Sequence, residues 1–467
     1  MQITGESVRV RASAPLPSAS AIFDGKLVKL RGARGEVLGV QVLRSSSEEA
    51  GMSLAIDDML VQAWRVDDVK VVRPSTEMYG PSTGAGSYPD VLVPGSGGDV
   101  KGGRDVLFDV GIPSDAVPGA HHGMIRIGAR TYDVSLEVVP VTLPSISDAP
   151  RVWGYYNPHE LERTKVDEAR AVAMFRDFGV AATPELTLDD ADRRAAQVAG
   201  MRFVPVLLPA SKHEIQRDAR AWAAWAARTH QQPFAIPIDE PRTLIDRLRV
   251  RVLARWIHEA GGGVWLAVTD APSWMYGDDV DVFIAPGAPG HGPPDRRWTY
   301  NGAPPRAGAM IADTDGVAMR TWGWIAFRYD VPLWYIWDVA YWRDRHNAAR
   351  RGLSKDEMPF VDDADAVTFD DGEDHGNLDG VLFYPPGLPS LRLAALRRGL
   401  EDRAMLDAVA ACAGRAKADA IAARVVPAAL GDSPPGDPGA WPTDEPSWDR
   451  ARNELLDAML ACAREPH

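Results

Sequence analysis

The chain has 467 residues, of which 45% are hydrophobic and 25% charged, and its formal net charge is −14. This length exceeds what one compact core supports, so we expect two or three domains. The acidic balance and the lack of a basic block argue against a nucleic-acid partner, and no apolar run is long enough to span a bilayer.

The first residues, Met1 to Glu6, lack the basic and apolar regions of a signal peptide. We therefore expect a protein that stays in the cytoplasm, or one that is secreted and has lost a leader. The two cysteines, Cys412 and Cys462, lie in alanine-rich helical segments without metal-ligand spacing. They are predicted to be small core residues rather than a disulfide.

Residues 1–147 read as β structure. Tyr132, Val134, Leu136 and Val138 alternate with polar residues, which is typical of a half-buried strand. Glycine, proline and serine separate further short runs at fairly regular spacing, and this spacing predicts an antiparallel β-sandwich. The other predicted strands are 26–30, 36–43, 69–73, 105–110 and 124–127, with a long loop over 79–103.

After a proline-rich linker, residues 148–386 alternate short apolar strands with helical stretches. This alternation indicates parallel βα units, and eight strands over this length predict a (β/α)₈ barrel. On the helix predicted over 242–260, the buried face is expected to carry Leu244, Leu248, Val252 and Trp256. The predicted strands are 152–156, 180–183, 203–208, 234–238, 263–268, 280–284, 309–312 and 333–337.

Residues 387–467 are predicted to be a helical region packed on the barrel. Pro389 and Ser390 suit a helix start, and the leucines that follow suit one long amphipathic helix. A last helix is expected over 447–463.

The adjacent carboxylates Asp239 and Glu240 follow the fourth predicted barrel strand, and Pro241 comes next. The carboxyl ends of barrel strands form the catalytic face. An Asp-Glu-Pro triplet is also common as a helix cap, so position on this face is what favours a catalytic role. Other polar and aromatic side chains predicted near this face are Tyr155, Tyr156, Asp270, Trp274, Tyr300, Asp313, Trp337, Asp338 and Trp342.

Carboxylates among aromatic side chains are typical of a glycosidase, and most of the fifteen tryptophans lie between Trp222 and Trp342. Two adjacent carboxyl groups repel each other when ionised, so one pKa is expected to rise and leave a general acid protonated. Neighbouring residues fit poorly as an opposed acid and nucleophile. They fit better with substrate-assisted catalysis, in which the 2-acetamido oxygen of the sugar is the nucleophile.

Several motifs resemble glycoside hydrolase family 123 over nearly the whole length. The most specific is Pro389-Ser390-Leu391-Arg392, followed by Arg397, Gly399, Leu400, Glu401 and Asp402. Weaker ones are Tyr88-Pro89-Asp90-Val91-Leu92, Asp239-Glu240-Pro241 and Trp298-Thr299-Tyr300-Asn301. The resemblance implies an exo-acting β-N-acetylgalactosaminidase in which Asp239 orients the acetamide and Glu240 is the acid/base.

We therefore expect a glycoside hydrolase that acts on a glycan with terminal β-linked N-acetylhexosamine, without metal or organic cofactor. Two alternatives stay open. A glycosidase for sugars without an acetamido group needs a separate nucleophile, such as Asp270, Asp313 or Asp338. A carbohydrate-binding protein without catalysis is the other. Arg320, Arg392, Glu401 and Asp402 are expected to be architectural, and the oligomeric state is left open.

Overall fold

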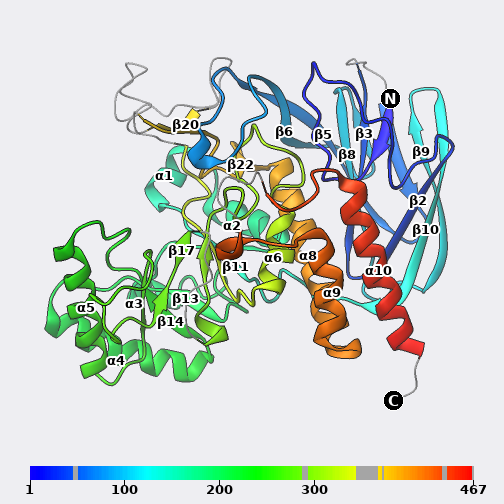
Figure 1. Cartoon of the computed structure of the whole chain (residues 1–467). Coiled ribbons are helices and arrows are strands. Elements are labelled where there is room, and N and C mark those ends of the chain that lie inside the picture. The colour runs from blue at the N-terminus through cyan, green and yellow to red at the C-terminus, as the bar shows by residue number, and fades with distance from the viewer. Residues whose placement is uncertain (46–50, 287–292, 343–366, 371–372, 434–438, 465–467) are drawn as a thin grey trace.

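The computed structural model describes residues 1–45, 51–286, 293–342, 367–370, 373–433 and 439–464. In Figure 1 the strands of the N-terminal region lie on the right and the parallel strands of the central region on the lower left. Helices α8 and α9 stand between them, with α10 beside the N-terminal strands. No helix in the described part of the chain has the length and hydropathy of a membrane span.

Two five-stranded sheets form the N-terminal region and share one apolar core, to which Val40 and Phe108 contribute from one sheet and Leu54 and Leu136 from the other. The first sheet has the order β1-β3-β8-β5-β6, with β1 Gln2–Thr4, β3 Val37–Leu43, β8 Asp105–Gly111, β5 Leu60–Val71 and β6 Gly86–Pro94. The second has the order β2-β10-β9-β4-β7, with β2 Leu27–Arg34, β10 Arg130–Thr142, β9 Gly119–Ile127, β4 Gly51–Ile56 and β7 Asp99–Lys101.

Two predictions for this region are wrong. The sandwich is not purely antiparallel, because β2 and β10 pair in parallel, with Leu27 opposite Asp133. Distant strands can pair in this way because the intervening chain supplies the crossover that a hairpin lacks. The predicted loop over 79–103 contains β6 and β7; β6 is an edge strand, where Pro89 and Pro94 cost no ladder hydrogen bond.

The central region contains parallel strands in two sheets. One has the order β12-β11-β19-β18-β17 and the other the order β13-β14-β15-β16. An isolated parallel bridge pairs Leu186, after β12, with Val206, after β13. The strands are β11 Val152–Gly154, β12 Val180–Ala182, β13 Phe203–Pro205, β14 Gln232–Ala235, β15 Trp265–Val268, β16 Val282–Phe283, β17 Ala285–Pro286, β18 Thr299–Tyr300 and β19 Trp334–Ile336.

These strands overlap the predicted ones except at 309–312, where the prediction is wrong. Ala309, Met310, Ile311 and Ala312 are fully buried but form no strand. A buried loop can be as apolar as a buried strand, so a short apolar run does not by itself identify a strand. The two-residue strand β18 is present instead, earlier in the chain.

Helices flank the parallel strands, and α1 to α5 each have a capping side chain at the N-terminus, such as Ser211 for α4 and Thr243 for α5. The helices are α1 Pro158–Arg163, α2 Glu168–Asp177, α3 Leu188–Ala191, α4 Lys212–Thr229, α5 Leu244–Glu259 and α6 Thr321–Arg328. Short elements complete the described chain: η1 Glu77–Tyr79, η2 Pro294–Arg296, β20 Val367–Asp370, β21 His375–Asn377, β22 Phe383–Tyr384, β23 Leu388–Pro389 and η3 Leu430–Asp432.

Helix α5 buries a different face from the predicted one. Leu244, Leu248 and Val252 are 53%, 42% and 42% exposed, whereas Val250, Ala254 and Ile257 are fully buried. The helix has two apolar stripes, and the stripe that includes the short Ala254 side chain packs toward α4 and β15. Periodicity alone does not distinguish between these two stripes.

The C-terminal helices are α8 Leu391–Ala413, α9 Arg415–Val425 and α10 Glu445–Arg464. As predicted, Ser390 begins α8, where its side chain accepts a hydrogen bond from the Leu393 amide. The helix is not amphipathic, however, because nearly every side chain from Leu391 to Leu406 is buried. Gly399 permits this burial: a Cβ atom there would lie 2.3 Å from the Arg320 carbonyl oxygen.

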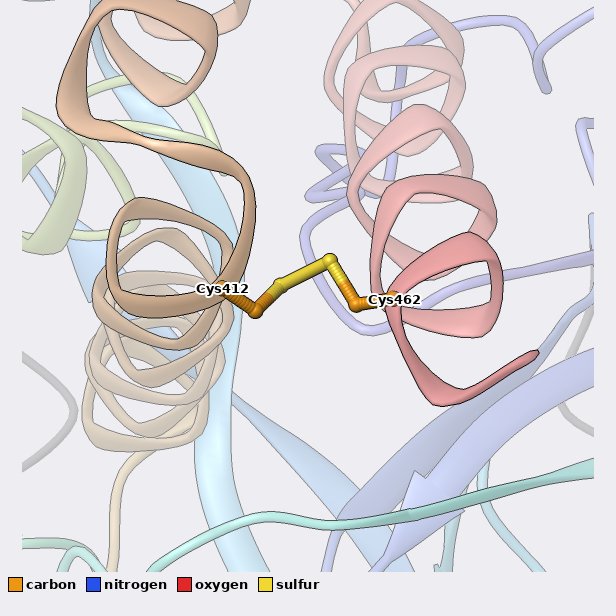
Figure 2. Close-up of a disulfide and its surroundings, with 2 residues drawn as sticks. All are labelled: Cys412 and Cys462. Atoms are coloured by element: carbon orange, nitrogen blue, oxygen red, sulfur yellow. A yellow bond between two sulfur atoms is a disulfide. The ribbon is translucent and has the colours of Figure 1, made fainter. Parts of the chain in front are cut away.

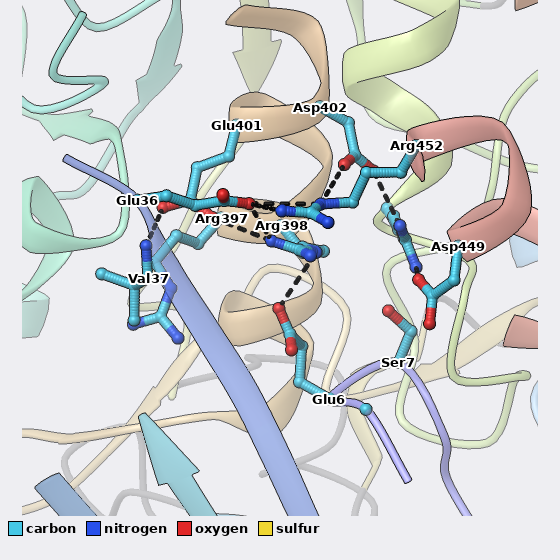
Figure 3. A network of polar contacts seen from close by, with 12 residues as sticks. Glu6, Ser7, Glu36, Val37, Arg397, Arg398, Glu401, Asp402, Asp449 and Arg452 are labelled. Carbon is cyan, nitrogen blue, oxygen red and sulfur yellow. Dashed lines mark hydrogen bonds and ion pairs between the residues drawn. The ribbon is translucent and has the colours of Figure 1, made fainter. Parts of the chain in front are cut away.

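A buried cluster of charged side chains joins α8 to the sandwich and to α10, and Figure 3 shows it from close by. Arg398 pairs with Glu36 at 2.6 Å, and Arg452 of α10 hydrogen-bonds the same carboxylate. Glu401 accepts a hydrogen bond from the Val37 amide at 2.9 Å. We call Glu6, Glu36, Arg320, Arg398, Glu401, Asp402 and Arg452 the junction cluster.

The four residues expected to be architectural all form buried polar contacts between segments. Arg320 pairs with Asp402 at 2.8 Å, and Arg392 pairs with Asp90 at 3.0 Å. Asp90 lies in β6, so Arg392 connects α8 to the sandwich. Glu401 makes a second connection to the sandwich through the Val37 amide. The helix was expected to pack on the barrel.

The prediction that the cysteines are separate core residues is wrong, because Cys412 and Cys462 form a disulfide between α8 and α10 (Figure 2). Their Cα atoms are 6.0 Å apart, although 50 residues separate them in sequence. The packing of the two helices creates this proximity, which spacing along the chain does not reveal.

Candidate active site

Asp239 and Glu240 lie beyond the carboxyl end of β14. Glu240 has a φ of 41°, in the left-handed region that non-glycine residues seldom adopt. Such backbone strain often occurs at functional sites. The two adjacent side chains line different cavities, which we name after them.

Thr269, directly after β15, links the two carboxylate residues. Its hydroxyl group donates a hydrogen bond of 2.6 Å to Asp239 Oδ1 and accepts one of 2.6 Å from the Glu240 amide. Tyr300 at the end of β18 donates a hydrogen bond of 2.9 Å to Glu240 Oε1. A residue directly after β15 thus positions Asp239, and a residue of β18, in the other parallel sheet, positions Glu240.

The Asp239 cavity has a volume of about 450 Å³, within the range of small-molecule sites. Its described lining contains four carboxylates and no arginine, lysine or histidine. The remaining surface is mostly aromatic, which suits the apolar face of a sugar ring. The lining residues are Trp153, Tyr155, Asn157, Glu160, Glu185, Ile236, Asp239, Tyr335, Trp337, Asp338 and Tyr341.

Burial raises the pKa values of three carboxyl groups in this cavity, those of Asp239, Glu185 and Asp338. Burial is the main cause of the raised pKa of Asp239, and the nearby Glu240 charge adds to it, against the hydrogen bond from Thr269. Burial and then the Asp239 charge raise the pKa of Glu185 to about 7. Burial also raises the pKa of Asp338 well above its ordinary value and that of Tyr155 to about 12. The raised pKa thus belongs to Asp239, the residue predicted to orient the acetamide, and its main cause is burial rather than the repulsion between the two carboxylates.

The Glu240 cavity has a volume of about 550 Å³ and the opposite electrostatic character. Three arginines, Arg242, Arg247 and Arg306, line it together with two carboxylates, Glu240 and Asp270. Arg242 Nη2 lies 3.1 Å from Glu240 Oε2, and Arg247 Nε lies 2.8 Å from Asp270 Oδ2.

The structure brings the predicted site residues together in two groups. Tyr155, Trp337 and Asp338 join Asp239 in its cavity. Asp270 and Tyr300 join Glu240 in the other.

Four predicted residues line neither cavity. Tyr156 is buried, and its hydroxyl group donates to Glu168 at 2.6 Å, because successive side chains of an extended segment point to opposite sides. Asp313 follows no strand; it is buried and accepts hydrogen bonds from the Ser75 amide and hydroxyl groups at 2.7 and 2.6 Å.

The other two are aromatic. Trp342 is buried against Phe383 and Tyr384, so its indole packs in the core. Trp274 is 84% exposed, beyond both cavities. Neither tryptophan therefore lines the Asp239 cavity or the Glu240 cavity.

Sequence reasoning missed Glu185, Thr269 and Tyr335. Glu185 follows β12 and Thr269 follows β15, so their position after a predicted strand was an available signal. Tyr335 lies within β19, where an aromatic residue reads as core.

These features define a class: a β-sandwich followed by parallel α/β units, with paired carboxylates at the carboxyl ends of the strands. No protein-family model matches the sequence, and no curated protein matches it significantly. Among solved structures, the chain shares its fold with a family 123 glycoside hydrolase from Clostridium perfringens, described in a study of glycolipid glycan hydrolysis. The TM-score is 0.61 at 12% identity, covering 99% of this chain and 98% of the other.

A Bacteroides ovatus GH5 xyloglucanase in complex with a heptasaccharide is 10% identical over 80% of this chain and 98% of its own. Its TM-score of 0.24 is too low to equate the two folds. The similarity in overall fold to the family 123 enzyme confirms the resemblance to family 123 that the sequence motifs indicated.

Proposed function

We propose that the protein is a glycoside hydrolase that removes terminal β-linked N-acetylhexosamine, with N-acetylgalactosamine favoured, by substrate-assisted retaining catalysis. The observation that carries the proposal is the placement of Asp239 and Glu240, adjacent in sequence and directed into two cavities. A fold shared with a family 123 glycoside hydrolase supports the same class of reaction.

In the first step, the acetamido oxygen attacks the anomeric carbon while the Glu240 carboxyl group donates its proton to the leaving oxygen. The glycosidic bond breaks, the alcohol departs, and the sugar keeps an oxazolinium-type ring. Asp239 accepts a hydrogen bond from the amide N–H, which becomes more acidic as the oxygen attacks. A carboxylate whose pKa is raised by burial is a stronger base for that proton.

In the second step, water attacks the anomeric carbon and the Glu240 carboxylate takes its proton. The bond between the amide oxygen and the anomeric carbon breaks, which regenerates the acetamide. Two inversions at this carbon give overall retention. Every proton and bond is accounted for by the sugar, water and Glu240, so the scheme needs no metal or organic cofactor.

We further propose that the parallel strands form a (β/α)₈ barrel, with the division into residues 1–147, 148–386 and 387–467. The bridge between Leu186 and Val206 supports continuity between the two sheets on one side. On the other side, β16 and β17 are one residue apart, and they pair with β15 and β18 respectively.

A glycosidase with its own nucleophile is the second candidate, since Asp338 lies in the Asp239 cavity. It is less well supported because Asp338 is only 4% exposed and its carboxylate is held by a hydrogen bond of 2.7 Å from the Ala340 amide. Asp313 is enclosed by the Ser75 and Ser82 hydrogen bonds, and Asp270 is engaged by Arg247 and Tyr276.

The test compares hydrolysis of chromogenic β-GalNAc, β-GlcNAc and β-galactoside. We expect activity on acetamido sugars only, with inhibition by a thiazoline analogue of the oxazolinium ring. Asp239→Asn should lower kcat/KM on all acetamido substrates by about 10²–10⁴-fold. Glu240→Gln should lower kcat/KM by a similar factor for substrates with poor leaving groups. The loss should be much smaller for nitrophenyl glycosides, because nitrophenolate departs without a proton.

Glu259→Gln, at the exposed end of α5, is the matched control and should leave the rates unchanged. Unchanged rates in both site variants, or equal turnover of the plain galactoside, would reject the proposal. Hydrolysis of no glycoside, with retained sugar binding, would favour the binding-protein alternative.

A further inference from the structure

The two cavities separate the two parts of a glycoside by charge. The proposed function, on which this inference rests, places the acetamido sugar over Asp239 and the leaving oxygen at Glu240. The part of the substrate beyond that oxygen then lies in the Glu240 cavity. The chemistry of the residues that line this cavity therefore indicates which kind of leaving group it can bind.

Arginine is the dominant charged residue of the Glu240 cavity. Arg242, Arg247 and Arg306 outnumber Glu240 and Asp270 in the described lining, so its formal charge is positive. The whole chain carries −14, which makes this local excess of positive charge an exception. The described lining of the adjacent Asp239 cavity contains four acidic side chains and no basic one, so it offers an anion no cationic partner.

The arginines can reach a ligand. The Arg242 side chain is 85% exposed and that of Arg247 is 28% exposed. Arg247 contacts Asp270 through Nε, and this hydrogen bond orients the guanidinium group. Guanidinium groups bind carboxylate and sulfate oxygens through paired N–H donors.

We propose that the Glu240 cavity is a subsite for an anionic leaving group, a sugar that carries a carboxylate or a sulfate. The natural substrate is then an acidic glycan whose terminal N-acetylhexosamine is β-linked to the anionic sugar. Hydrolysis releases that sugar with its charge intact, and only the glycosidic bond is broken.

Three disaccharides of identical linkage test the proposal: N-acetylgalactosamine β-linked to glucuronate, to glucose 6-sulfate and to glucose. We expect kcat/KM to be about tenfold higher for at least one anionic disaccharide than for the neutral one. The anionic disaccharide that is preferred identifies the group recognised. Raising the salt concentration should reduce the ratio, because the arginines are partly exposed.

The double variant Arg242→Gln/Arg306→Gln should bring the ratio of anionic to neutral rates close to one. The matched control is Arg249→Gln on α5, outside the cavity lining and 69% exposed, which should keep the wild-type ratio. Equal kcat/KM for all three disaccharides in the wild type would overturn the subsite and leave the proposed function standing.

Binding to Glu240→Gln, measured by calorimetry, separates the two proposals further. If the wild type hydrolyses no acetamido glycoside, the proposed function falls. Tighter binding of an anionic disaccharide than of the neutral one would then still support the subsite. Equal binding would overturn it.

Discussion

Carboxylates are buried in two regions of the molecule, the junction cluster and the Asp239 cavity, but their surroundings differ. In the junction cluster Glu36 pairs with Arg398 and Arg452, and Asp402 pairs with Arg320. In the cavity, no described side chain forms an ion pair with Asp239, Glu185 or Asp338.

The pKa of Asp402 reflects this difference, whereas burial and the Glu36 charge raise the pKa of Glu401, in the same cluster, to about 8. Burial raises the pKa of Asp402, but Arg320, Arg398 and Arg452 outweigh it and hold that pKa below its ordinary value. Burial acts without such compensation in the cavity, so the pKa of each of these carboxyl groups rises. Compensated carboxylates fix the position of one segment against another. Uncompensated ones have raised pKa values, which are typical of functional sites.

Removal of an arginine from the junction cluster is expected to have the largest effect. Arg398→Met removes an ion-pair partner that lies 2.6, 3.5 and 3.5 Å from Glu36, Glu6 and Glu401 respectively, and only Arg452 then remains beside Glu36. The free energy of unfolding should fall by about 3–5 kcal/mol, since unpaired buried charge is costly. Denaturant unfolding at pH 7 measures this change.

The control for that variant is Arg249→Met, which removes an exposed arginine and should change stability by less than about 0.5 kcal/mol. If both variants unfold alike, the junction cluster does not depend on charge compensation.

The opposite result is expected from neutralising a cavity carboxylate. The folded pKa of Glu185, about 7, lies above its ordinary value of 4.5, so the unfolded chain releases this proton first. Wild-type stability should therefore fall between pH 4.5 and 7, by on the order of 3 kcal/mol from this group. Glu185→Gln should remove that slope and be more stable than the wild type at pH 7.

Unfolding at pH 4.5 and 7.5 measures both limits, with Glu259→Gln as the exposed control. A variant that loses stability at pH 7 would mean that Glu185 is compensated after all, and the contrast between the two regions would disappear.

The smallest effect is expected from Thr269, the neutral donor to Asp239. Thr269→Val removes a hydrogen bond that lowers the pKa of Asp239, so that pKa should rise. The acidic limb of the kcat/KM profile should move to higher pH, with a loss of about tenfold at pH 5. Thr269→Ser should restore the wild-type profile, and an unshifted limb in the valine variant would show that Thr269 only supports the backbone.

Much of the fold could be predicted from periodicity. Alternation located the long sandwich strands, and apolar runs located most parallel strands, because their patterning is local. The failures have physical causes: β18 is two residues long, and residues 309–312 are apolar because they are buried beneath other elements. The parallel β2–β10 pair and the disulfide depend on contacts between distant segments.

The site was predictable where a carboxylate follows a strand. Asp239 and Glu240 follow β14, and both line cavities. The direction of a side chain was not predictable: Tyr155 lines a cavity and Tyr156 is buried beside it. Glu185 was missed because a single acidic residue after a short strand resembles any solvated turn.

The junction cluster also affects how the chain is made. Arg398 and Arg452 lie 362 and 416 residues after Glu36, so the ribosome adds them roughly tens of seconds later. Until then the early sandwich presents Glu6 and Glu36 to water on the surface that α8 will cover. The same surface carries apolar side chains such as Val66, Tyr88 and Leu107, which share a core with α8, so the nascent sandwich keeps an exposed apolar face until its last helices are made.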